Sequence, residues 1–415
     1  MLTQKPHTWL EIDPNAFSHN IRLYKELSAP NTIISVVLKS NAYGHGIEQM
    51  AKLCQENADV QWLCTASLSE ALIIRNLGIT KPIIVLSIID EDPALAIIHD
   101  IDLPIFDLDT AIILNQIGVA LNKKIAVHVK IDSGMSRFGL HTNEALHVIQ
   151  EIHKLPGIMI RALFTHCAES GNPNPSFTLE QLEQFNSVIK QCDDAGIQIS
   201  YKHAANSAAA SLSSILSAIA LASAEALASE GTMQSLFTFN FIRLGAGAYG
   251  LWHFRDAPSN HANLDLKPVL SWKTRISHLK KVPANSCIGY DRTFQTTRET
   301  IIATIPVGYH DGYDRRFTNQ GIIRIRDYYA HVVGRICMNA TLIAIPEGHE
   351  VALGDEVILL GDYDQLRAHD LATLIGSFNA REITTRLSPH LIRKIMPVDA
   401  VHEKTCKNAE KIVSL

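Results

Sequence analysis

A lysine at the end of a predicted buried strand is the first residue in this chain whose position suggests chemistry. Lys39 follows the apolar run ISVVL and precedes the segment SNAYGHG. An amine in apolar surroundings is costly unless it is used, and a desolvated lysine is a nucleophile toward carbonyl groups. A solvated surface lysine fits this context poorly. Lys39 is therefore a candidate covalent anchor for an aldehyde.

Other polar residues are expected at the ends of later strands. They are Arg137 after the fifth strand, His166 after the sixth, Ser207 after the seventh and Arg243 on the eighth. In a (β/α)₈ barrel these ends face one mouth, where active sites and phosphate sites form. The Ser207 hydroxyl and the backbone of the GAG segment at 245–247 could hold an anion. A phosphate site beside a reactive lysine indicates pyridoxal 5′-phosphate (PLP) as cofactor.

The barrel itself is predicted from alternation along the chain. Eight short β-branched runs are separated by segments with helical spacing of apolar residues, over roughly 250 residues, the size of a (β/α)₈ barrel. The runs are TIISVVLKS, WLCTAS, IIVLS, PIFDL, AVHVKIDSG, IRALFTHC, ISYKHAAN and FIRLGAGAYG. An open doubly wound sheet is the alternative that this rhythm leaves.

The pattern changes after about residue 262, where short strands follow one another with a single clear helix near 366–377. We therefore predict a barrel over 11–262, a mostly β domain over 263–398 together with 1–10, and a tail over 399–415. A segment at about 208–235 is rich in Ala, Leu and Ser. Its serines and Glu225 argue against a membrane span and favour an insertion in the barrel.

Composition narrows the function classes. The chain has 415 residues, 47% of them hydrophobic, and a formal charge of −5 without a basic block, which argues against nucleic acid as a partner. The N-terminal segment does not read as a signal peptide, and no membrane span is expected. Seven cysteines without a CxxC motif favour reduced thiols in the cytoplasm, without disulfides or a metal site.

Seven ordered motifs between Trp9 and about Lys394 resemble the alanine racemase family. They are VVLKSNAYGHG, KIDSGMSRFG, HAANSAAA, RLGAGAYG, CIGYDRTF, IPVGYHDGYDRR and VVGRICMNAT. The resemblance implies a PLP barrel followed by a β domain, and a homodimer with shared active sites. It also implies the interconversion of L-alanine and D-alanine, which supplies D-alanine for cell-wall peptidoglycan.

The resemblance assigns the two bases of racemisation. Lys39 would hold PLP and act on the D face of the substrate, and Tyr290 of a partner subunit would act on the L face. Removing a proton from one face while delivering one to the other requires groups on both sides of the substrate. For a lone tyrosine such as Tyr290, an interface role would otherwise be the simpler interpretation.

The resemblance also implies binding roles. Tyr43, Ser207, Gly245 and Ala246 match the phosphate contacts. Arg243 matches the arginine that faces the pyridine nitrogen, with His203 supporting it and His166 stacking on the ring. Arg137 and the backbone of Met338 match the substrate carboxylate site, and Tyr309 lines the entrance. Lys130 matches a position that is often carbamylated in the family, although an unmodified lysine paired with an acid remains open.

One departure concerns specificity. Family members usually carry a tyrosine before the acidic residue of the C-terminal segment, whereas this chain reads SFNAREITTRL, with Arg381 before Glu382. Arg381 either binds the phosphate or leaves room for serine beside alanine. Broader small amino-acid racemisation is thus one alternative function. A PLP-barrel decarboxylase and a non-catalytic PLP-binding protein are the others.

Overall fold

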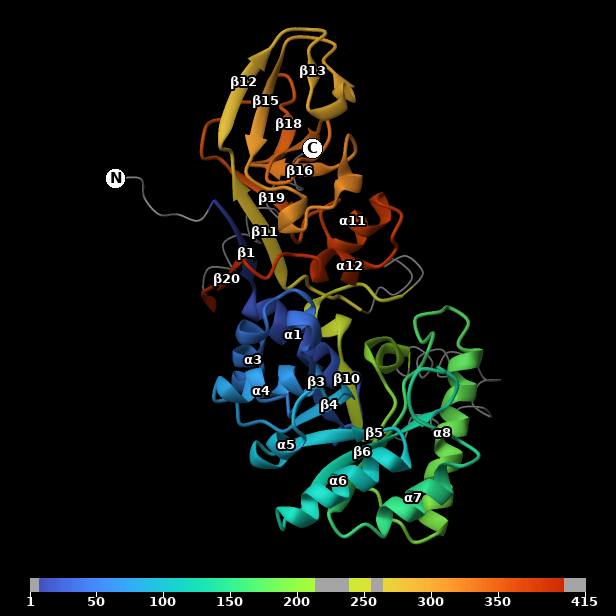
Figure 1. Cartoon of the computed structure of the whole chain (residues 1–415). Helices are drawn as coiled ribbons and strands as arrows, with labels where there is room; N and C mark the ends of the chain where they lie inside the picture. The colour runs from blue at the N-terminus through green and yellow to red at the C-terminus, as the bar shows by residue number, and fades with distance from the viewer. Residues whose placement is uncertain (1–6, 213–238, 255–263, 399–415) are drawn as a thin grey trace.

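The computed structural model describes residues 7–212, 239–254 and 264–398. Most of the predicted insertion at 208–235 and the whole predicted tail at 399–415 lie outside the described residues. Two bodies follow one another along the long axis of the molecule (Figure 1), with the barrel at one end and the C-terminal β-sheet at the other. In the described part of the chain, no helix is long and apolar enough to cross a membrane.

Eight parallel strands form the first body, and the barrel prediction is confirmed. They are β2 (Ile33–Val37), β3 (Trp62–Ser67), β4 (Ile83–Ile88), β5 (Ile101–Ile105), β6 (Ile125–Asp132), β8 (Ile158–Phe164), β9 (Tyr201–His203) and β10 (Phe241–Leu244). Their order is β10-β2-β3-β4-β5-β6-β8-β9, and a two-residue strand, β7 (Leu140–His141), pairs with β6. A parallel bridge between Asn206 and Arg243 joins the two ends. The sheet is therefore closed, unlike an open doubly wound sheet.

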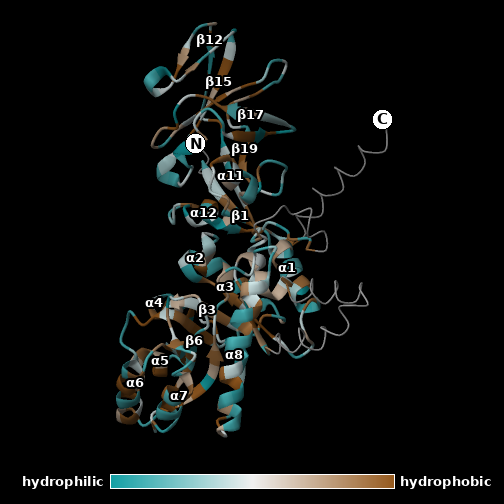
Figure 2. Ribbon diagram, turned by 90° about the vertical axis from the view of Figure 1, so that its right-hand side faces the viewer, coloured by the Kyte–Doolittle hydropathy of each residue, from teal (hydrophilic) through white to brown (hydrophobic). Residues whose placement is uncertain are grey.

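Helices surround these strands. They are α1 (Pro14–Glu26), α2 (Lys39–Tyr43), α3 (Ile47–Glu56), α4 (Leu68–Asn76), α5 (Ala94–Ile98), α6 (Leu108–Ala120), α7 (Ala145–His153) and α8 (Ser176–Asp194). Side chains cap several N-termini: Asp13 before α1, Ser67 before α4 and Asp107 before α6 each accept backbone N–H groups. Figure 2 shows hydrophobic stretches along the barrel strands and a largely hydrophilic α8 outside them.

The second body is a nine-stranded sheet that includes the start of the chain. Its strands are β1 (Thr8–Ile12), β11 (Leu270–Arg275), β12 (His278–Val282), β15 (Thr300–Ile305), β16 (Ile322–Ile325), β17 (Tyr328–Val332), β18 (Thr341–Ala344), β19 (Glu356–Leu360) and β20 (Ile392–Ile395). The order is β12-β15-β18-β17-β16-β19-β11-β1-β20, antiparallel except for the β1–β20 pair. A short hairpin, β13 (Cys287–Ile288) with β14 (Phe294–Gln295), stands beside it.

The helix predicted near 366–377 corresponds to α11 (Ala368–Leu374), and a second short helix that was not predicted, α12 (Ala380–Thr385), follows it. The first ends at Leu374, and Gly376 follows two residues later with a φ of +72°, a left-handed conformation that glycine adopts without penalty. The second begins at Asn379, whose side chain accepts the Arg381 N–H. The turn residues 376–379 therefore separate the two helices.

The C-terminal domain meets the barrel at the turn after Lys39. A Cβ added to Gly44 would lie 1.8 Å from the Thr384 carbonyl oxygen of α12, so only glycine allows this approach. From β20, the Arg393 guanidinium donates two hydrogen bonds of 3.0 and 2.9 Å to the Gly44 carbonyl. The C-terminal domain thus braces the lysine-bearing turn.

Candidate active site

The lysine-bearing turn has an unusual backbone. Ser40, Asn41 and Ala42 after β2 have φ values of 54°, 54° and 52°, in the left-handed region. Such residues cost roughly 1–2 kcal/mol each, so surrounding contacts must hold them. The Glu70 carboxylate supplies one: it accepts the Ser40 N–H at 2.6 Å and the Ala66 N–H at 2.8 Å.

The Lys39 side chain is half-buried and has no ion-pair partner among the described residues. Burial lowers the pKa of its amine, and the positive charges of Arg137, Arg381 and Arg243 lower the pKa further, while Glu70 opposes them. A lower pKa increases the neutral fraction of the amine near neutral pH, and the neutral form is both the nucleophile and the base.

Beside this lysine lies an anion cradle. The Ser207 hydroxyl accepts the Gly245 N–H at 3.0 Å and the Gly247 N–H at 3.1 Å. Ala246 begins the short 3₁₀ helix η1 (Ala246–Tyr249) between them. A Cβ at Gly245 would lie 2.5 Å from the Tyr43 hydroxyl oxygen, so this close approach needs glycine. These groups bring hydroxyls and backbone N–H groups to one place.

Arg243 lies at the centre of the barrel mouth, 3% exposed. Its Nη1 donates to His203 Nδ1 at 2.6 Å and to the His203 carbonyl at 2.9 Å. Its Nη2 donates to the carbonyls of Thr165 and Ala204 at 2.8 and 3.1 Å and contacts His166 Nδ1 at 3.4 Å. A guanidinium has five N–H groups, so the Nε–H alone has no partner within the described residues. It is the donor left for a ligand.

Two further predicted residues lie near this mouth. Arg137 is exposed, and its charge acts on Lys39, Lys130 and His166. Lys130 is 3% exposed, and its amine lies 5.4 Å from the centre of the Phe164 ring. Burial, together with the charges of Arg243 and Arg137, lowers the pKa of Lys130 to about 8.

The structure separates the remaining three residues from this group. Tyr290, Tyr309 and Met338 belong to the C-terminal domain and are 67%, 44% and 56% exposed. Tyr309 and Met338 are neighbours, because the Tyr309 N–H bonds the Cys337 carbonyl and the next N–H bonds the Met338 carbonyl. Tyr290 follows β13, which lies at the end of the C-terminal domain far from the barrel (Figure 1). One chain alone therefore does not bring Tyr290 to Lys39.

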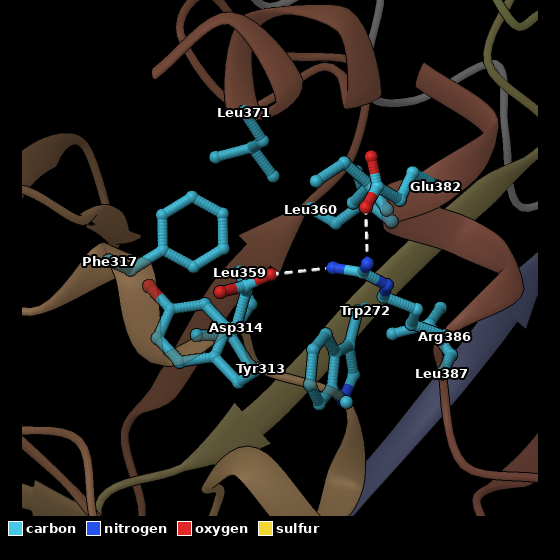
Figure 3. Close-up of a pocket in the computed structure, with 12 residues that line it drawn as sticks. Trp272, Tyr313, Asp314, Phe317, Leu359, Leu360, Leu371, Glu382, Arg386 and Leu387 are labelled. Atoms are coloured by element: carbon cyan, nitrogen blue, oxygen red, sulfur yellow. Dashed lines mark hydrogen bonds and ion pairs between the residues drawn. The ribbon is translucent and has the colours of Figure 1, made fainter. Parts of the chain in front are cut away.

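An ion-pair cluster anchors the helix α12 in the C-terminal domain (Figure 3). The Arg386 guanidinium pairs with the carboxylates of Asp314, at 2.8 Å between Nη1 and Oδ2, and of Glu382. These groups lie near Trp272 and line a small pocket of the C-terminal domain. The pocket is mostly apolar, and its charged groups pair with one another. It is a packing feature that fixes α12, and so fixes the position of Arg381 beside the mouth.

Sequence reasoning missed three residues that the structure connects to the site: Glu70, Asp102 and His128. Glu70 lies near the start of a helix, where an acid is common, so nothing distinguished it. His128 was detectable, because it precedes Lys130 by two positions on one strand and so shares its face. Asp102 carried no signal outside the folded barrel.

Comparisons with known proteins cover nearly the whole chain. Residues 12–252 match the family described as alanine racemase, N-terminal domain, and residues 269–395 match alanine racemase, C-terminal domain. The chain is 35% identical to an alanine racemase of Halothermothrix orenii over 93% of this chain and 96% of that protein. It is also 35% identical to alanine racemase 2 of Caldanaerobacter subterraneus, over 88% and 89%.

Solved structures show the same similarity. The alanine racemase of Clostridium difficile is 31% identical and superimposes with a TM-score of 0.84, covering 95% of this chain and 97% of that one. The alanine racemase of Bacillus anthracis with bound L-Ala-P is 28% identical, with a TM-score of 0.80 and coverage of 95% and 96%.

Proposed function

Because the chain belongs to the alanine racemase family, and so is an enzyme, we propose that it interconverts L-alanine and D-alanine with bound PLP at its barrel mouth. The observation that carries this proposal is the placement of three groups together. They are the half-buried Lys39 amine, the Ser207 cradle and the Arg243 Nε–H.

The residues present fit this cofactor. The Ser207 hydroxyl, oriented by the N–H groups of Gly245 and Gly247 that it accepts, suits a phosphate as a donor, and the Tyr43 hydroxyl lies close to Gly245. The Lys39 amine suits the aldehyde, and the Arg243 Nε–H suits the pyridine nitrogen. When bound, PLP supplies electron withdrawal that acidifies the substrate α-hydrogen. Arg243 can donate a hydrogen bond but gives up a proton reluctantly, which leaves the ring nitrogen unprotonated.

Proton transfer is the work of the chain's own residues. In this proposal the Lys39 Nζ removes or delivers the α-proton on the D face, and its lowered pKa favours the neutral form. The Tyr290 hydroxyl of a second subunit does the same on the L face. Arg137 and the backbone of Met338 bind the substrate carboxylate, and Tyr309 lines the entrance. His166 lies against the ring.

The exposed aromatic residues support a homodimer as part of this proposal. Tyr290 and Tyr309 expose large side chains on the C-terminal domain, and Lys39 is the base that this proposal assigns to the barrel mouth. In a two-fold dimer, each C-terminal domain can complete the mouth of the other subunit. The exposure of these residues supports the proposal that each site is shared between two subunits.

The function is tested by chiral chromatography of L-amino acids incubated with PLP-loaded protein. We expect L-alanine and D-alanine to converge on equal amounts from either side. Carbon dioxide release from any amino acid without inversion would mark a PLP decarboxylase. The absence of both reactions from protein that retains PLP would leave only a binding function.

We expect Lys130 to carry a carbamate. Its amine is buried without an ion-pair partner in the described structure, while the Asp132 carboxylate already accepts three backbone N–H groups. A carbamate would replace a cation that repels Arg137 with an anion that orients it. Since carbon dioxide adds to neutral amine, the adduct should increase as pH rises through about 8, the lowered pKa of Lys130.

The measurement is a ¹³C NMR spectrum of protein equilibrated with ¹³C-bicarbonate, with Lys130→Gln as the control. We expect one protected carbamate signal in the wild type and none in the variant. A high-resolution map with a bare Lys130 amine at pH above 8 would contradict the assignment.

Arg381 is expected to broaden substrate choice. Its Nε donates to Asn379 Oδ1 at 2.8 Å, and the residue is exposed, so the guanidinium is turned toward its own helix start. Its charge still acts on the pKa values of Lys39 and Tyr43. A tyrosine at 381 would crowd the substrate side chain. A pocket discriminates one small group by about 10- to 200-fold, so we expect measurable serine racemisation beside alanine.

The experiment compares serine and alanine kcat/KM in wild type and in Arg381→Tyr. We expect the serine-to-alanine ratio to fall in Arg381→Tyr by about 10-fold or more. Arg298→Tyr is the control, because Arg298 pairs with Glu347 on the exposed surface of the same domain. Strict alanine specificity in the wild type, unchanged by Arg381→Tyr, would show that Arg381 has no such role.

A further inference from the structure

A buried chain of polar side chains crosses the barrel below the site. It runs from Arg243 Nη1 to His203 Nδ1 at 2.6 Å, and from His203 Nε2 to His128 Nδ1 at 2.8 Å. His128 Nε2 then contacts Asp102 Oδ2 at 2.9 Å. Arg161 ends the chain, with its Nη1 at 2.7 and 2.9 Å from the two Asp102 oxygens. Five strands, β10, β9, β6, β5 and β8, contribute one residue each.

The groups at the two ends of this row of hydrogen bonds determine which atom donates and which accepts in each bond. A guanidinium only donates, so His203 Nδ1 must accept from Arg243 and carry no hydrogen. The His203 Nε2–H then donates to His128 Nδ1, which must therefore also carry no hydrogen. The His128 Nε2–H in turn donates to the Asp102 carboxylate. Both imidazoles are therefore neutral, with the hydrogen on Nε2.

The surroundings leave the two imidazoles no other polar arrangement. The Phe164 ring stacks on the His203 ring, with 4.9 Å between the ring centres and 8° between the ring planes. The centre of the Phe241 ring lies 4.7 Å from that of His203, and the centre of the Trp62 ring lies 5.9 Å from that of His128. Both histidines are fully buried. Burial lowers the pKa of each ring, with the charge of Arg243 contributing to both, in agreement with neutral rings.

We propose that Asp102 is a positioning residue for Arg243, acting through His128 and His203. The Asp102 carboxylate fixes both tautomers, so that His203 always presents a bare Nδ1 to the guanidinium. Because His203 receives two of the hydrogen bonds of Nη1 through its ring and carbonyl, it holds the plane of the guanidinium. That plane sets where the free Nε–H lies. What the Nε–H faces rests on the proposed function, but the tautomers do not.

Asp102→Asn tests this with almost no change in volume. Arg161 can only donate, so the asparagine carbonyl oxygen should face Arg161 and its NH₂ should face His128 Nε2. The proton direction would then reverse, which places the hydrogen of each ring on Nδ1. The new His203 Nδ1–H would oppose the N–H groups of Arg243, and the guanidinium would lose an acceptor.

The direct readout is long-range ¹H–¹⁵N NMR of ¹⁵N-histidine-labelled protein, which reports ring tautomers with or without cofactor. We expect two buried Nε2–H rings in the wild type and Nδ1–H rings in Asp102→Asn. His128→Gln and His203→Gln assign the signals. In the PLP-loaded enzyme, Asp102→Asn should lower kcat by about 10- to 100-fold, which is the effect expected from the loss of one hydrogen bond to a charged group. The KM should stay nearly constant.

Asp107→Asn is the matched control, because Asp107 caps α6 after the same strand and asparagine caps equally well. It should change neither tautomers nor kcat. Protonated or Nδ1–H rings in the wild type, or reversed tautomers in Asp102→Asn without a fall in kcat, would overturn the proposal. A wild type with the expected tautomers but no racemase activity would instead refute the proposed function alone.

Discussion

Lys39→Ala should abolish racemisation, lowering kcat by about 10⁴-fold or more, because one substitution removes both the cofactor's anchor and the base for the D face. Burial and the charges of Arg137 and Arg381 lower the pKa of this amine, which favours its neutral, reactive form. Borohydride reduction followed by peptide mass mapping should find PLP attached to residue 39 of the wild type and to no residue of the variant.

The control for this result is Lys52→Ala. Lys52 lies on the neighbouring helix α3, is exposed, and pairs with Glu48 at 2.8 Å. Its loss should change neither attachment nor rate. Cofactor trapped at another lysine of the wild type would show that Lys39 is not the anchor.

Tyr290→Phe should have the second-largest effect, and a directional one. Removing the hydroxyl leaves the aromatic ring in place but removes the proposed acid and base of the L face, which contributes about 10²- to 10⁴-fold. In D₂O, the rate of α-hydrogen exchange should fall sharply for L-alanine. It should fall much less for D-alanine, because Lys39 can still remove the α-proton on the D face. Chiral chromatography with mass detection gives both rates.

Tyr329→Phe serves as the matched control. The Tyr329 hydroxyl donates to the Asp364 carbonyl at 2.9 Å within the same domain, so the substitution makes the same chemical change away from the proposed site. Equal losses of exchange from both isomers in Tyr290→Phe would contradict the assignment of Tyr290 to one face.

The barrel was predictable because its signals are local. Apart from the three-residue β9, each barrel strand has four to eight residues and lies in a short apolar run such as WLCTAS or IIVLS, and helical spacing separates the runs. Lys39, Ser207 and Arg243 were found because strand ends converge in a closed barrel. The helix predicted near 366–377 corresponds to α11, whereas the second helix, α12, whose N-terminus Asn379 caps, was not predicted.

Long-range polar contacts escaped the sequence for a physical reason. Asp102 and His203 lie about a hundred positions apart and are joined only through His128, which lies on a strand between theirs in the sheet. Glu70 holds the turn after Lys39 because the left-handed backbone there exposes the Ser40 N–H, and that backbone has no sequence signature beyond its glycines. Tyr290 was identified by family resemblance, and its distance from Lys39 within one chain became visible only in the fold.

Mixing the two inactive variants tests the central claim most directly. If Lys39 and Tyr290 of different subunits form each site, a hybrid of Lys39→Ala and Tyr290→Phe subunits contains one intact site and one doubly altered site. Random exchange makes half the dimers hybrid, so alanine racemisation should recover to about a quarter of the wild-type rate. No recovery, with hybrid dimers demonstrated by native mass spectrometry, would show that the two residues do not act on one substrate across the interface.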